Sequence, residues 1–159
     1  MDGQSKYFVI FHKLLKRYKH SFAQLLEELS LTPCEADILM LLGAEPACDT
    51  ATEICARFGI SRALVCRSVE TLLARGYLHA AHDRADRRLI RLSLCDAALP
   101  AARALRQYAA EYYSRLFYGV DPQDFEVFKR VLLRMAENVA VPEDGALQED
   151  WMEKERLHI

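Results

Sequence analysis

The sequence has no hydrophobic run that approaches the roughly 18 consecutive apolar residues a membrane-spanning helix requires. Its first residues also lack the basic, apolar and small-residue segments that together make an export signal. The five cysteines are odd in number and include no CxxC pair, which argues against both a disulfide framework and a zinc knuckle. These absences predict a cytoplasmic protein that does not associate with a membrane.

Motifs of catalysis are missing as well. The sequence contains no strand–turn–helix nucleophile site, no glycine-rich phosphate loop and no paired-carboxylate pattern. His79 and His82 stand three residues apart on an expected strand, so they point to opposite faces and make a poor metal pair. We therefore expect no enzyme, no metal and no cofactor. The enzyme alternative, a hydrolase using Cys34 or Cys66 with a histidine, has no motif behind it.

Charge is unevenly distributed along the chain, although the formal net charge is only −2. Residues 57–91 hold eight arginines against three acidic residues, a local charge of +5. The rest of the chain carries 13 basic and 20 acidic residues, a charge of −7. A basic segment on an otherwise acidic protein is typical of a nucleic-acid-binding surface, although solvated helix faces also concentrate arginine.

Apolar side chains at alternating steps of three and four residues predict long helices toward both ends of the chain. A further helix follows Thr32, which suits the N-cap, with Pro33 in its first turn and Glu35 completing a capping box. Gly119 separates the last two helices. The helices expected from these patterns cover about 5–29, 33–44, 97–118 and 122–140.

The basic segment itself predicts a helix-turn-helix followed by a β-hairpin. Ile54 and Phe58 face inward on a short helix, which Gly59 ends in the left-handed conformation. Ser61 then caps a longer helix, in which Leu64 or Val65 begins the inward face. After it the periodicity changes to two, and a charged turn joins two short strands. These elements are helices at about 49–58 and 61–75, strands at 77–82 and 89–94, and the turn 83–88.

The fold class is therefore mainly α with a small β-hairpin wing: a winged helix-turn-helix whose N- and C-terminal helices form a dimerisation domain. The apolar stripes of the terminal helices exceed what one winged helix can cover, and closed two-fold pairs are the commonest oligomers, so we expect a homodimer. The C-terminal tail is expected either to be partly disordered or to dock on the rest of the chain through Trp151. The expected segments are a dimerisation helix (1–32), a DNA-binding lobe (33–95), dimerisation helices (96–140) and an acidic tail (141–159).

A helix that follows a tight turn fits the major groove of DNA and reads bases with residues near its N-terminus. An arginine there can bond guanine in bidentate fashion, and the wing arginines can enter a narrow minor groove. Asp86 could hold the Arg88 guanidinium through a charge-assisted bond. The alternatives are a solvated helix face and a charged hairpin that keeps a sheet edge soluble. The expected DNA-binding residues are Ser61, Arg62, Ala63, Cys66, Arg67, Arg84, Asp86, Arg87 and Arg88.

Four stretches carry a family resemblance: LTPCE at 31–35, TEICARFGIS at 52–61, LLARGYL at 72–78, and DRADRR at 83–88 followed by LSL at 92–94. Together they resemble the MarR family of bacterial regulators, whose winged-helix homodimers usually repress transcription from pseudo-palindromic operators. The resemblance implies that 61–75 is the recognition helix and that Arg88, with Asp86 as its partner, enters the minor groove. The chain departs from the family at Cys95, where threonine usually follows the second wing strand.

The resemblance also implies release of DNA by a phenolic compound or an oxidant. Cys66 is a candidate thiol because it lies between arginines on the recognition helix, although it also suits the role of a small neutral groove residue. The many aromatic residues of the terminal helices either line a pocket for a small aromatic ligand or form core. The sequence does not identify the residues that would bind such a ligand. A winged helix that binds a protein partner and has no operator is the alternative function.

Overall fold

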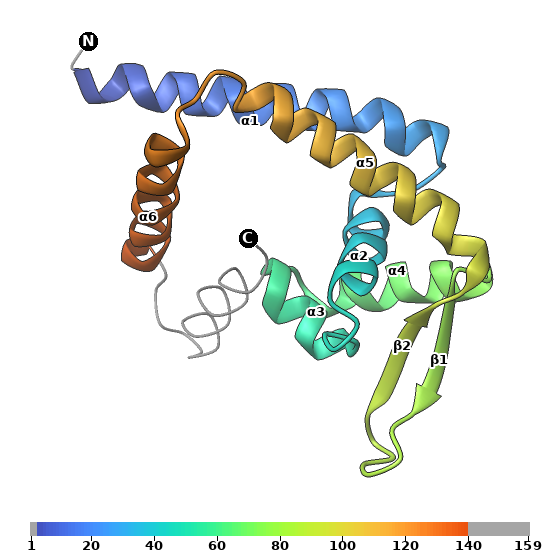
Figure 1. Cartoon of the computed structure of the whole chain (residues 1–159). Coiled ribbons are helices and arrows are strands. Elements are labelled where there is room, and N and C mark those ends of the chain that lie inside the picture. The colour runs from blue at the N-terminus through green and yellow to red at the C-terminus, as the bar shows by residue number, and fades with distance from the viewer. Residues whose placement is uncertain (1–2, 140–159) are drawn as a thin grey trace.

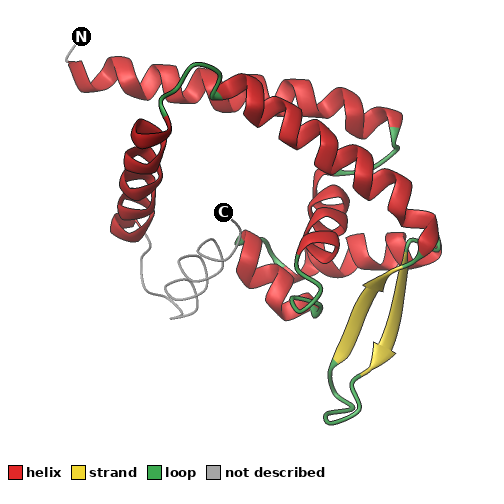
Figure 2. Ribbon diagram, viewed as in Figure 1, coloured by secondary structure: helices red, strands yellow, loops and turns green. Residues whose placement is uncertain are grey.

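The computed structural model describes residues 3–139, and the acidic tail at 141–159 lies outside the described residues. Long helices form one layer, a compact lobe of shorter helices lies beneath it, and a hairpin projects from that lobe (Figures 1 and 2). The elements in chain order are α1 (Gly3–Glu28), α2 (Pro33–Ala44), α3 (Ala51–Phe58), α4 (Arg62–Ala74), β1 (Leu78–His82), β2 (Ile90–Leu94), the 3-10 turn η1 (Asp96–Ala98), α5 (Leu99–Leu116) and α6 (Pro122–Val139). This arrangement confirms the predicted mainly helical winged helix-turn-helix.

Two helices of the lobe begin with the same device. The hydroxyl of Thr32 accepts the backbone N–H of Glu35, whose carboxylate in turn accepts the backbone N–H of Thr32. Thr50 and Glu53 repeat this capping box at the start of α3. Each box satisfies donors that the first turn of a helix leaves without intrahelical partners, which sets where the helix begins. The predicted N-terminus of α2 is therefore confirmed.

The hydrophobic core lies inside the lobe and extends to α5. Helix α2 is central, since it packs against α4, α5 and β2. The largest fully buried side chains are Ile38, Leu39, Ile54, Val65, Leu72 and Leu105. They come from α2, α3, α4 and α5, so this core holds the helix-turn-helix to the long helices above it.

The hairpin is an antiparallel pair in which Leu78 lies opposite Leu94 and His82 opposite Ile90. Leu92 is buried against the lobe, whereas Ile90, expected on the same face, is half exposed. Ile90 lies nearer the wing tip, where the lobe no longer covers the strand. The alternating pattern of β2 is thus confirmed, but only Leu92, in the middle of the strand, is fully buried.

Two local expectations differ from the structure, and the structure decides one choice that the sequence left open. Phe58 is 37% exposed instead of inward, because it ends α3 and its ring is only partly covered. The helix expected from about 97 begins as the turn η1, and Cys95 in the N-cap position makes no side-chain capping bond. That uncapped start is the place where the sequence departs from the family pattern. Between Leu64 and Val65, the structure buries Val65 completely and leaves Leu64 exposed.

The long helices expose much apolar surface. Rings of Tyr18 and Tyr112 pack edge to face at 5.0 Å, which joins α1 to α5. Helix α6 stands apart from the lobe and contacts the end of α5 through Phe117, whose ring lies 4.6 Å from that of Phe125 (Figure 1). Exposed apolar side chains on these helices include Tyr7, Phe8, Phe11, Leu15, Tyr113, Leu116, Phe128, Val131, Leu132 and Met135. None of the helices within residues 3–139 has the length and apolar character that crossing a bilayer takes.

Candidate nucleic-acid interface

A tight turn at Gly59 and Ile60 joins α3 to α4. Gly59 adopts the left-handed conformation (φ 61°), which glycine reaches without a steric penalty. Ser61 then caps α4 by accepting the backbone N–H of Leu64 at 3.4 Å. Ser61 thereby occupies the predicted position, at a helix N-terminus whose dipole favours a phosphate.

The outward face of α4 is formed by its predicted site residues and one that was not predicted. Ser61, Arg62, Ala63 and Arg67 are exposed, and Cys66 is half-buried. Leu64 is also exposed, because the core takes its neighbour Val65. Consecutive residues of a helix point about a quarter-turn apart, so the sequence left this choice open. The exposed face therefore combines two arginines with an apolar side chain.

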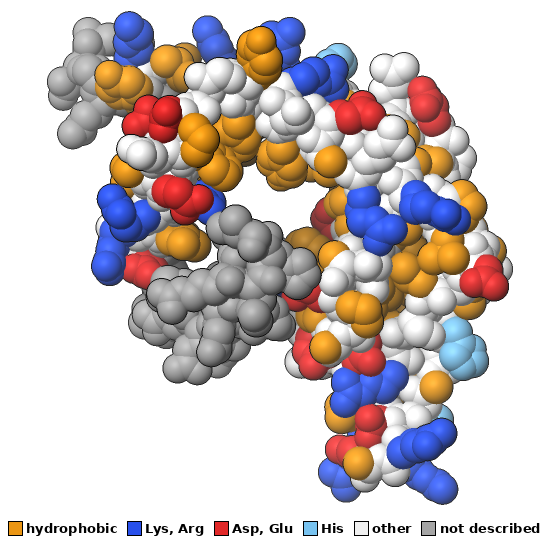
Figure 3. Space-filling view, viewed as in Figure 1, with side chains coloured by type: hydrophobic (Ala, Val, Ile, Leu, Met, Phe, Trp, Pro, Cys, Tyr) orange, Lys and Arg blue, Asp and Glu red, His pale blue; other side chains and the backbone are white. Residues whose placement is uncertain are grey.

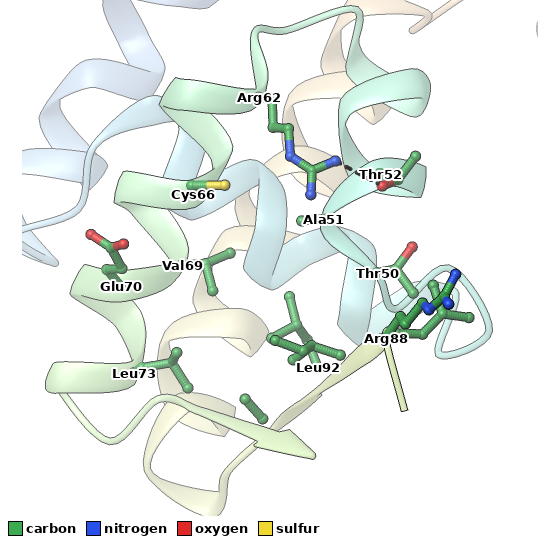
Figure 4. Close-up of a pocket in the computed structure, with 13 residues that line it drawn as sticks. Thr50, Ala51, Thr52, Arg62, Cys66, Val69, Glu70, Leu73, Arg88 and Leu92 are labelled. Carbon is green, nitrogen blue, oxygen red and sulfur yellow. Dashed lines mark hydrogen bonds between the residues drawn. The ribbon is translucent and has the colours of Figure 1, made fainter. Parts of the chain in front are cut away.

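The two arginines of α4 have different surroundings. A nitrogen of the Arg62 guanidinium donates to the Thr52 hydroxyl at 3.2 Å, so Arg62 turns toward α3 (Figure 4). Arg67 donates to the carbonyl of Ala63 at 3.3 Å and lines a separate groove with Leu64 and the start of α2. The two arginines of α4 therefore line different hollows of the surface.

The wing turn is organised by aspartates. One carboxylate oxygen of Asp83 accepts the backbone N–H groups of Ala85 and Asp86 at 2.8 and 2.9 Å. Asp86 in turn accepts the backbone N–H of Arg88 at 3.0 Å. Short polar side chains that bond to the backbone two or three residues ahead are typical of tight turns. The turn leaves the side chains of Arg84, Arg87 and Arg88 exposed, and Figure 3 shows basic side chains gathered at the wing tip.

The partnership expected between Asp86 and Arg88 takes another form. The Asp86 carboxylate bonds to the backbone N–H of Arg88, not to its guanidinium. Two residues apart within a tight turn, the amide is the nearer donor, and the side chain is left to extend outward. Asp86 therefore shapes the turn that presents Arg88.

Three of the eight arginines in the basic segment are half-buried, by contacts with carboxylates or backbone carbonyls that the sequence did not indicate. Arg57 pairs with Glu45 at 2.6 Å, and Arg75 donates to backbone carbonyls at the end of α1. Arg91 lies between Asp49, at 2.6 Å, and Asp83, at 3.0 Å. The other five, at 62, 67, 84, 87 and 88, are exposed on α4 and the wing.

A cavity of about 280 Å³, here called the wing cavity, lies between α4, the start of α3 and the wing. Arg62 and Arg88 both line it from opposite sides, and Cys66 faces it from α4 (Figure 4). The apolar part of its wall comes from Val69, Leu73 and Leu92, among others. The wing cavity shows that the first turn of α4 and the wing present arginines to the same face of the lobe.

Other titratable groups lie away from this face. Burial raises the pKa of the Cys34 thiol, which leaves it protonated and poorly suited to nucleophilic chemistry. Burial also raises the pKa of Asp37 to about 6. Burial, followed by the neighbouring Tyr113 and then Asp37, raises the pKa of the Tyr18 phenol to about 12. Within residues 3–139, no group of three or more His, Cys, Asp or Glu side chains gathers as a metal site.

Comparison with known proteins gives concordant matches. A profile of the MarR family matches residues 29–89. The transcriptional regulator AdcR of Streptococcus pneumoniae serotype 2 (strain D39 / NCTC 7466) is 30% identical over 108 residues, which are 66% of this chain and 73% of that protein. The S. aureus MepR–DNA complex matches with a TM-score of 0.76 at 17% identity, over 86% of this chain and 99% of that chain. A MarR family transcriptional regulator from Silicibacter pomeroyi has a TM-score of 0.72 at 21% identity, over 85% and 90% of the two chains.

Proposed function

The chain belongs to the MarR family of transcriptional regulators, and on that premise we propose that it binds a pseudo-palindromic DNA operator as a homodimer and acts as a repressor. In this function α4 enters the major groove, and the wing enters the neighbouring minor groove. The protein acts in the cytoplasm and needs neither a catalytic step nor a cofactor.

The observation that carries this proposal is the position of the exposed arginines. Arg62, from the first turn of α4, and Arg88, from the wing, line the same cavity, so both can reach one duplex. Arg67 and the outer wing residues Arg84 and Arg87 extend the basic surface on either side. The residues proposed to face the DNA grooves are those predicted from the sequence. Ser61 and the helix N-terminus would bind a phosphate, and Ala63 and Cys66 would face the bases.

A homodimer is supported by the apolar side chains that α1, α5 and α6 expose. Contiguous apolar patches of more than a few hundred Å² are uncommon on monomeric proteins and usually mark an interface. In the dimer, segments 1–32 and 96–140 form the interface, and 33–95 forms one DNA-binding lobe in each subunit. A two-fold pair of lobes matches the two half-sites of a palindrome.

Release of the operator follows one of two routes in this proposal. A small aromatic ligand would act through the long helices, where rings such as Tyr18 and Tyr112 are packed together. An oxidant would act on Cys66, whose thiol lines the wing cavity beside the arginines. A bulky oxidation product at Cys66 would obstruct the groove-facing side of α4.

Fluorescence anisotropy tests the proposal directly. The duplex is taken from upstream of the protein's own gene, and a scrambled duplex of equal length is the comparison. We expect binding about 10³-fold tighter to the specific duplex, with affinity that falls steeply as salt rises. Arg88→Ala should weaken the specific complex, whereas Arg103→Ala, an exposed arginine of α5, should not.

Two results would contradict the proposal. Equal, salt-sensitive binding to both duplexes, and to duplexes selected from a random pool, would remove sequence specificity. Absence of binding even at low salt would favour the alternative, a winged helix that binds a protein partner and has no operator.

A further inference from the structure

Arg91 joins the wing to the start of α3. Its guanidinium donates to a carboxylate oxygen of Asp49 at 2.6 Å and to one of Asp83 at 3.0 Å. Asp49 and Arg91 are 42 positions apart in the sequence. These three side chains, here called the Asp49–Arg91–Asp83 bridge, are partly buried, with 38% of the Arg91 side chain exposed.

Each carboxylate of the bridge is fixed to its own element. The second oxygen of Asp83 accepts two backbone N–H groups of the wing turn, so moving Asp83 means moving that turn. Asp49 donates its backbone N–H to Glu53 of the α3 capping box and accepts the N–H of Leu92 through its carbonyl at 2.8 Å. One guanidinium therefore links the turn that carries Arg88 to the cap of α3.

A link of this kind matters because the wing is a two-stranded hairpin. Such hairpins have little stability of their own and twist readily. The β1–β2 ladder pairs His82 with Ile90 at its outer end, and the exposed arginines lie on the turn beyond it. The angle between that turn and α4 therefore depends on contacts with the lobe.

The charges of the bridge indicate that Arg91 does not itself serve as a DNA contact. Two carboxylates surround one guanidinium, so its charge is already compensated. Hydrogen bonds from the backbone of Asp86 and Ala85, together with Arg91, lower the pKa of Asp83, which keeps this carboxylate ionised. The hydrogen bonds to Asp49 and Asp83 also raise the pKa of Arg91.

We infer that Arg91 is a positioning residue, which holds the wing against α3 at the angle that brings Arg88 into the minor groove while α4 lies in the major groove. The inference rests on the proposed function. It assigns Arg91 and Asp49 to DNA binding although neither touches DNA. Ion pairs that solvent still reaches add little to global stability, so the role of the bridge is geometric.

A double-mutant cycle separates positioning from other effects. The probe is the tightest duplex that the wild-type protein recovers from a random pool. We expect Arg91→Leu to weaken binding about tenfold in the wild-type background and less than twofold when Arg88→Ala is already present. Circular dichroism and thermal unfolding of each variant check that the fold is retained. Independent effects, in which Arg91→Leu weakens both backgrounds equally, would overturn the inference.

Asp49→Asn provides a second test, because net charge and positioning predict opposite changes in DNA affinity. Removing a negative charge near DNA should strengthen binding if only net charge matters. Positioning predicts weaker binding, because the bridge is broken from the α3 side while Arg91 remains. Unchanged or tighter binding by Asp49→Asn would therefore contradict the inference, even if Arg91→Leu failed to fold. A wild-type protein that binds no duplex selectively would instead show that the proposed function is wrong.

Discussion

Arg75, directly after α4, donates a hydrogen bond of 2.7 Å to the backbone carbonyl of Ser30, two residues after the end of α1. A second nitrogen of the same guanidinium donates to the carbonyl of Leu29 at 3.2 Å, and its carbon lies 4.6 Å from the centre of the Tyr77 ring. The last carbonyls of a helix have no intrahelical partners, and a cation there also favours the helix dipole. The end of α4, the proposed recognition helix, is thus tied to the end of α1.

Removing this link should lower stability. We expect Arg75→Met to reduce the free energy of unfolding by about 1–2 kcal/mol, because two carbonyls lose a charged donor. Urea unfolding followed by circular dichroism measures the change. Arg103→Met is the matched control, since Arg103 is exposed and bonds a carbonyl of its own helix. Equal stability of the two variants would contradict the capping role of Arg75.

Ser30 has a positive φ of 52°, a conformation that glycine adopts more readily. We expect Ser30→Gly to stabilise the protein by about 0.5 kcal/mol, because steric strain relieved in the folded state exceeds the added freedom of the unfolded chain. Gly59→Ala is the converse change. An added Cβ would meet no atom within 4 Å, but the φ of 61° disfavours alanine, so we expect the free energy of unfolding to fall by about 1 kcal/mol. Thermal unfolding of both variants checks the opposite signs.

Asp37 predicts a pH-dependent effect. Burial raises its pKa from 3.8 to about 6, so the folded protein binds this proton more tightly than the unfolded chain does. Its contribution to stability is therefore present below about pH 4 and lost as the pH rises through about 6. Asp37→Asn should stabilise the protein on the order of 1 kcal/mol at pH 7.5, after allowance for solvent screening, and hardly at all at pH 4. Denaturant titrations at both pH values test this, and an equal change at both would count against it.

We predict that Leu64 contacts the methyl group of a thymine. It is 38% exposed on the face of α4 that is proposed to enter the major groove, where that methyl is the apolar feature of a base pair. In the tightest duplex, replacing one thymine by uracil should weaken wild-type binding about threefold, and the same change should not affect Leu64→Ala. Uracil placed in the flanks is the control. Equal sensitivity of both proteins at every position would exclude this role.

The dimer proposal predicts a monomeric variant. Val131 and Met135 are 50% and 57% exposed on α6, and glutamate at both positions would bury charge in the proposed interface. We expect the dimer dissociation constant to rise about 100-fold or more, with unchanged helix content. Sedimentation velocity gives the oligomeric state. Arg130→Glu, an exposed position of the same helix, should leave the dimer intact.

The exposed face of α4 and the wing turn show where sequence reasoning was sufficient and where it was not. Ser61 as N-cap, Gly59 as the turn residue and the exposed arginines of the wing followed from residue type and spacing. The choice of Val65 over Leu64 for the core did not, because the two are neighbours with equal hydrophobic character. Asp86 was placed in the correct turn but given the wrong donor, since the backbone of Arg88 competes with its side chain.

By itself the sequence determined the features that depend on residues two to four positions apart. The capping box at Thr32, the helix periodicities and the alternation of β2 are of this kind, because their partners lie within one turn or one pleat. Only the tertiary structure decided the contacts between distant segments. Arg91 meets Asp49, and Arg75 meets Ser30, because packing of the core brings together elements more than 40 residues apart. An arginine carries no local signal of which carboxylate or carbonyl the folded chain will place beside it.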